Sequence, residues 1–119
     1  MKFTTRIIDY GKLTRTGRSY SPTETLIPER QIYGTIEPPD GLSIPVQDVC
    51  AFARVFERPD GVWAEIATLE QHHHGRTFSE LMDAGYSVAP MGAGNIAEDG
   101  LVRNYHLVSF YLTKEPSFI

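Results

Sequence analysis

The sequence has few of the features that would assign it to a specialised class of protein. It contains one cysteine, Cys50, so an internal disulfide framework is excluded. No apolar run approaches the ~20 residues that a transmembrane helix needs. Residues 1–6 lack the apolar stretch of a secretion signal. We therefore expect a protein that is made and used in a cytoplasm.

Positive charge is also scarce. The chain has 11 Lys and Arg residues against 15 Asp and Glu residues, which gives a formal net charge of −4 at pH 7. The basic residues are scattered along the chain, whereas a nucleic-acid-binding protein usually concentrates them on one surface. The expected partner is therefore another protein or a second copy of the chain, with no nucleic acid and no membrane.

Motifs for cofactors and metals are missing as well. Gly92-Ala93-Gly94 lacks the longer glycine spacing of a nucleotide-binding loop and does not open a helix. Residues 72–74 are three consecutive histidines. Neighbouring residues in an extended segment point to opposite sides, so three in a row do not converge on one ion. We expect these histidines to form a solvated loop between a hairpin and a helix, and we expect no cofactor and no metal.

What the sequence does contain is a succession of strand signals. Its 119 residues and 41% hydrophobic content suit one domain, residues 1–119, with a core of its own. β-branched and apolar runs bounded by Gly, Pro and Asp predict strands at residues 2–9, 31–37, 49–57, 62–69, 86–89 and 101–112. The expected fold is α+β and β-dominated, a twisted sheet or partly closed β-barrel with one short helix.

The predicted helix covers about residues 77–84. Thr77 and Glu80 have the spacing of a capping box, and Phe78 and Leu81 begin an apolar stripe of helical period. A helix of about two turns is unstable alone, so it must pack on the sheet.

The clearest hairpin joins residues 49–57 and 62–69 through an Arg-Pro-Asp-Gly turn. Both faces of its strands read as largely apolar, which suits strands buried on two sides. One short helix covers only part of one side. We therefore expect a remaining apolar face of the sheet to be buried against another chain.

Five segments stand in the order and spacing of a known family. They are residues 16–22 (TGRSYSP), 33–39 (YGTIEPP), 61–66 (GVWAEI), the helix and glycine-rich stretch at 75–94, and the closing strand at 107–117, which ends in Pro-Ser. Over about residues 14–117 the chain resembles the prohead core protein proteases of tailed bacteriophages, a family that shares its fold with the herpesvirus maturational proteases.

The resemblance places the family's catalytic positions on residues without that chemistry. Its histidine falls on Pro38, its nucleophilic serine on Ala89 or Pro90, its arginine on Met91, and an aspartate near the end of the pattern on Tyr111. A protease that loses its nucleophile or base loses several powers of ten in rate. The resemblance implies a vestigial cleft or interaction site formed by Glu37, Pro38, Ser87, Ala89, Pro90, Met91 and Tyr111.

Three functions remain open at this point. The first is a non-catalytic phage virion or assembly component, such as a capsid decoration, connector or scaffold-associated protein, present in the host cytoplasm during assembly and then in the virion. The second is an active serine endopeptidase with a relocated nucleophile, for which Ser87 and Ser109 are the candidates. The third is a small phage inhibitor or adaptor of a host protein.

Overall fold

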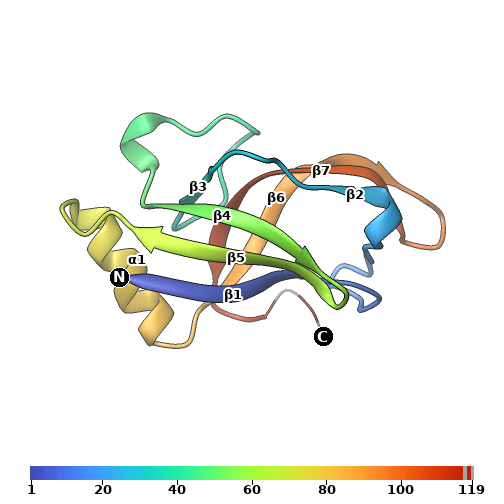
Figure 1. Ribbon diagram of the computed structural model, residues 1–119, viewed down its shortest axis with the longest axis horizontal. Coiled ribbons are helices and arrows are strands. Elements are labelled where there is room, and N and C mark those ends of the chain that lie inside the picture. The colour runs from blue at the N-terminus through green and yellow to red at the C-terminus, as the bar shows by residue number, and fades with distance from the viewer. Residues whose placement is uncertain (117, 119) are drawn as a thin grey trace.

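The computed structural model of the protein describes residues 1–116 and 118 (Figure 1). Ser117, in the predicted Pro-Ser end, and Ile119 lie outside the described residues. The elements are β1 (Lys2–Asp9), η1 (Pro22–Glu24), β2 (Thr25–Leu26), β3 (Ile32–Thr35), η2 (Val46–Asp48), β4 (Ala51–Arg58), β5 (Gly61–Thr68), α1 (His73–Asp83), β6 (Ser87–Ile96) and β7 (Val102–Thr113). The predicted α+β, β-dominated class is confirmed.

The strands form a single sheet in the order β1-β5-β4-β3-β7-β2, and β6 pairs with the other edge of β7. β1, β5, β4 and β3 are antiparallel neighbours, whereas β7 runs parallel to β3 and β2. The sheet curls into a half-barrel that brings β6 close to β1, while α1 lies across one end (Figure 1). The predicted partly closed sheet is therefore confirmed. No helix in the described part of the chain is long and apolar enough to cross a membrane.

Small side chains on β4 and β5 allow the sheet to curl tightly around its core. Ala51, Ala53 and Ala64 on its inner face are fully buried. The interior is filled instead by two aromatic rings, Phe78 from α1 and Phe110 from β7, whose centroids lie 6.1 Å apart at an interplanar angle of 82°. This edge-to-face contact fixes the helix to the sheet.

The outer face of the β4–β5 hairpin differs from the expected apolar surface. Arg54 and Glu65 stand directly opposite each other there and are exposed. The ring of Trp63 lies 4.6 Å below the Arg58 guanidinium, and its Nε1 donates a hydrogen bond to Asp60 (2.9 Å). Because charged groups interrupt the aromatic ones and pair with them, the prediction of a second, largely apolar face is wrong for this hairpin.

Helix α1 begins at His73, four residues before the predicted start, and ends at Asp83, close to the predicted end. Thr77 is not a cap: its hydroxyl donates to the carbonyl of His73 within the helix. The first turn of the helix packs closely on the end of the preceding segment. A Cβ at Gly75 would lie 1.8 Å from the carbonyl oxygen of Leu69, so only glycine allows this contact, and the contact sets where the helix starts. The expectation of a loop is therefore wrong for the second and third histidines, although all three are exposed as expected.

A small polar network anchors α1 to β5. The Ser79 hydroxyl lies 2.9 Å from Thr68 Oγ1 and 2.8 Å from Glu70 Oε1, and Thr68 Oγ1 donates to the same carboxylate at 2.6 Å. Together with the Met1 amine, these donors lower the pKa of Glu70 to about 2, with the amine making the largest contribution.

Strand β6 extends well beyond the predicted residues 86–89 and includes Gly92-Ala93-Gly94. The glycines are needed for close packing, because a Cβ on Gly92 would lie 2.2 Å from the carbonyl oxygen of His106 and 2.7 Å from the Tyr105 hydroxyl. Glycine has a low intrinsic preference for strands, so local pattern alone ends the strand too early.

Candidate functional site

Part of the predicted vestigial site lies on two neighbouring strands, β6 and β7. Tyr111 of β7 stands opposite Thr35 of β3 on one side and Ala89 of β6 on the other. Met91 follows on the same face, opposite Ser109. Ala89 is 1% exposed, so the position that the resemblance gives to a nucleophile is covered as well as chemically inert.

The seven predicted residues do not share one cavity. Glu37 and Pro38 border a cavity of about 520 Å³ beside Cys50, after β3 has ended. Ala89, Pro90 and Tyr111 border another, of about 260 Å³, which is closed by residues of the 14–20 segment. Ser87 faces a third, between β6 and β1. The histidine and serine positions of the resemblance thus open onto different surfaces.

Pro38, Ala89 and Pro90, at the histidine and serine positions of the resemblance, offer no group for proton transfer or nucleophilic attack. Proline and alanine side chains have no heteroatom, and Cys50 is buried, which raises the pKa of its thiol and opposes thiolate formation. Within residues 1–116 and 118, no hydrogen bond joins a histidine ring to a serine hydroxyl. Neither position of the resemblance can therefore supply the nucleophile or the base of acyl transfer.

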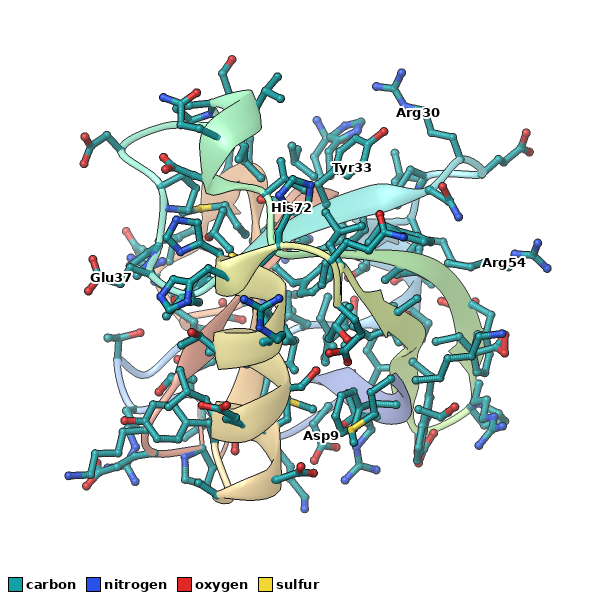
Figure 2. All side chains as sticks on the ribbon, turned by 90° about the vertical axis from the view of Figure 1, so that its left-hand side faces the viewer. Asp9, Arg30, Tyr33, Glu37, Arg54 and His72 are labelled. Carbon is teal, nitrogen blue, oxygen red and sulfur yellow. The ribbon has the colours of Figure 1, made fainter. Side chains whose placement is uncertain are left out.

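A larger cavity than these three lies elsewhere in the protein. A cleft of about 940 Å³ opens beside β3, and we call it the β3 cleft. Its walls come from residues 28–33, from residues 42–49 around η2, from Leu69, His72 and His74 at the start of α1, and from residues 107–109 of β7. Figure 2 looks at this end of the molecule and labels Tyr33 and His72, which both line the cleft.

The β3 cleft is bordered by apolar side chains that no other part of the described chain covers. Tyr33 is 52% exposed, Leu42 46% and Val46 87%. Ile32 and Leu107 also line the cleft and are buried. Cavities of this size with mainly apolar walls and a few polar groups are typical of binding sites. The cleft is therefore the leading candidate for the functional surface.

Ser109 is the polar group at the base of this cleft. It stands on β7 opposite Tyr33, is 2% exposed, and its Oγ has no hydrogen-bond partner within the protein. A buried hydroxyl without a partner destabilises the fold, since its hydrogen bonds to water are lost without replacement.

We expect Ser109→Ala and Ser79→Ala to change stability in opposite directions. Both serines are buried, but Ser79 donates to the Thr68–Glu70 network and Ser109 has no partner. Ser109→Ala should raise the free energy of unfolding by about 1 kcal/mol, and Ser79→Ala should lower it by about 1–2 kcal/mol. Urea unfolding followed by circular dichroism measures both. Equal losses in the two variants would show that Ser109 has a partner in solution.

The sequence signal for the β3 cleft was present but weak. Residues 42–46 read Leu-Ser-Ile-Pro-Val, with an apolar side chain at every second position of a segment rich in proline. Such a segment reads as a loop, and loops seldom keep exposed apolar residues without a use for them. What the sequence did not reveal is that this segment faces β3 and the histidines of α1.

Within residues 1–116 and 118, no group of three His, Cys, Asp or Glu side chains is placed to hold a metal ion. The structure is that of a small half-barrel protein with a largely apolar cleft beside β3. Comparisons with protein-family models, curated proteins and solved structures find no match to this chain. The functional argument therefore depends on the residues and geometry of the protein itself.

Proposed function

We propose that this protein is a non-catalytic component of a tailed-phage virion or of its assembly, built on a degenerate prohead protease fold. It acts by contact, as a capsid decoration, connector or scaffold-associated protein would. The observation that carries the proposal is the exposed apolar surface of the β3 cleft, with Tyr33, Leu42 and Val46 at its border. Exposed apolar surface of this kind on a small domain is typical of protein interaction sites.

The inert positions Pro38 and Ala89 support the same proposal. A scaffold that retains the order of the family's segments but places no nucleophile at these positions is freed from the geometry of a catalytic site. Its remaining role is then to present a surface. The protein is expected in the host cytoplasm during assembly and in the particle once bound.

Mass spectrometry of purified particles and assembly intermediates tests this proposal. The protein should be present in a fixed ratio to a capsid or tail protein. Val46→Asp should reduce its incorporation at least about tenfold, because a charge enters the apolar surface at a residue that is 87% exposed and contributes little to stability. Leu13→Asp, at a side chain that is 51% exposed and remote from the cleft, is the matched control.

Absence of the protein from particles and intermediates would overturn the proposal. Capture of one specific host protein in that case would instead identify an inhibitor or adaptor. Equal incorporation of the Val46→Asp and Leu13→Asp proteins would show that the β3 cleft is not the surface that binds the particle.

One observation favours a serine endopeptidase as the second candidate: Ser109 shares the β3 cleft with His72 and His74. This candidate requires the hydroxyl to approach one of the imidazoles when substrate binds. It predicts labelling by a fluorophosphonate probe that is lost in Ser109→Ala, with Ser87→Ala as the control. An unlabelled wild-type protein that remains intact during long incubation excludes it.

A further inference from the structure

The turn between β6 and β7 carries an exposed apolar residue next to two carboxylates. We call residues 96–99 the hairpin tip. Ile96 is 52% exposed, and Glu98 and Asp99 follow it, both exposed. On a protein with a formal charge of −4, this combination gives the tip an apolar contact point and a local negative charge.

The hairpin tip has a fixed conformation. The Ala97 amide donates to the Leu101 carbonyl at 2.9 Å, and the Gly100 amide donates to the Ala97 carbonyl at 2.9 Å. Asp99 accepts a hydrogen bond from the Leu101 amide at 3.0 Å, which closes an Asx turn. Because these bonds already order the tip, little conformational entropy is lost when it binds.

The β3 cleft is complementary to the hairpin tip in both polarity and charge. Its walls are apolar, and its polar lining includes Arg30, His72 and His74. In the part of the chain that the structure describes, no Asp or Glu lines the cleft. Ile96 would therefore meet the apolar walls of the cleft. The carboxylates of the tip would meet the fixed positive charge of Arg30 and no negative charge.

The two surfaces lie at opposite ends of an elongated molecule. The protein measures 43 × 26 × 25 Å. In Figure 1 the β6–β7 turn is at the right-hand end, whereas α1 and the loop that leads into η2 are at the left-hand end. A tip cannot enter the cleft of its own chain across this distance, so the contact has to be made between two copies.

We propose that the β3 cleft binds the hairpin tip of a second copy of this chain. Ile96 of one copy packs against Tyr33 and Val46 of the next, and the carboxylates of the tip face the side of the cleft that carries Arg30. The contact is head-to-tail, so repetition produces a ring if the rotation closes and a filament if it does not. This inference rests on the proposed function, because it names the partner of the same cleft.

Two complementary variants test the inference. Sedimentation velocity of the wild-type protein should show species larger than a dimer that increase with concentration. Val46→Asp destroys the cleft surface and Ile96→Asp destroys the tip, and each should weaken self-association at least about tenfold. An equimolar mixture should then form a 1:1 heterodimer and nothing larger, because only one intact cleft and one intact tip remain per pair. Leu13→Asp should associate like the wild type.

The inference is overturned by a wild-type protein that stays monomeric at its highest soluble concentration, or by a symmetric dimer that both variants retain. Glu98→Lys provides a second test without an effect on packing, since Glu98 is exposed and lies outside the hydrogen bonds of the turn. It should weaken association and make it less sensitive to salt. A strict monomer that is nevertheless found in particles would reject self-association and leave the proposed function in place.

Discussion

Phe110→Ala is expected to lower the free energy of unfolding by about 3–5 kcal/mol. The ring is 0% exposed and makes the edge-to-face contact with Phe78 that holds α1 against the sheet. Its removal leaves a cavity between the helix and strands that the surrounding alanines cannot fill. Because small domains have a total stability of about 5–15 kcal/mol, this is a large fraction of the whole. Urea unfolding at fixed pH measures the loss.

Tyr33→Ala is the matched control for this prediction. Tyr33 is an aromatic residue on β3, the strand that pairs with β7 beside Phe110, but its side chain is 52% exposed in the β3 cleft. Its replacement should cost less than about 1 kcal/mol of stability and should weaken binding at the cleft. Equal destabilisation by the two alanine variants would contradict the assignment of Phe110 to the core and Tyr33 to the surface.

Gly34→Ala is expected to lower the free energy of unfolding by about 1–3 kcal/mol, although only one methyl group is added. A Cβ at this position would lie 2.1 Å from Cε2 of the Phe110 ring, and the ring is enclosed on its other side by α1. The ring must therefore shift, or β3 must move away from β7. Thermal or urea unfolding measures the change.

The partner mutation makes the prediction specific. In a Phe110→Ala background the added methyl group has space, so Gly34→Ala should then be neutral or stabilising. Gly41→Ala is the control, since nothing lies within 4 Å of a Cβ built on Gly41. Additive effects of the Gly34 and Phe110 substitutions would show that the close approach does not exist in solution.

Local pattern was sufficient for most of the strands. Residues 2–9 were predicted as a strand and form β1 with the same bounds, because β-branched residues in alternation favour an extended backbone wherever the strand is placed. The β4–β5 hairpin followed from its Pro-Asp turn in the same way.

The errors arose where distant residues decide the local structure. Helix α1 starts at His73 because Gly75 packs on the backbone of Leu69, and β6 continues through Gly92 because Tyr105 lies over it. Neither neighbour is visible in a window of local sequence. The mixed outer face of the hairpin was missed because the apolar residues were read without the register that places Arg54 opposite Glu65.

The sequence by itself determined the fold class, most of the strands, the single helix and the lack of a nucleophile at the positions of Pro38 and Ala89. Only the tertiary structure decided where an interaction surface lies. The β3 cleft joins segments around residues 30, 45, 72 and 108 because β7 pairs with β3 in parallel and α1 closes the same end of the sheet. Pairing between strands more than 70 residues apart depends on the packing of the whole core, which no local pattern contains.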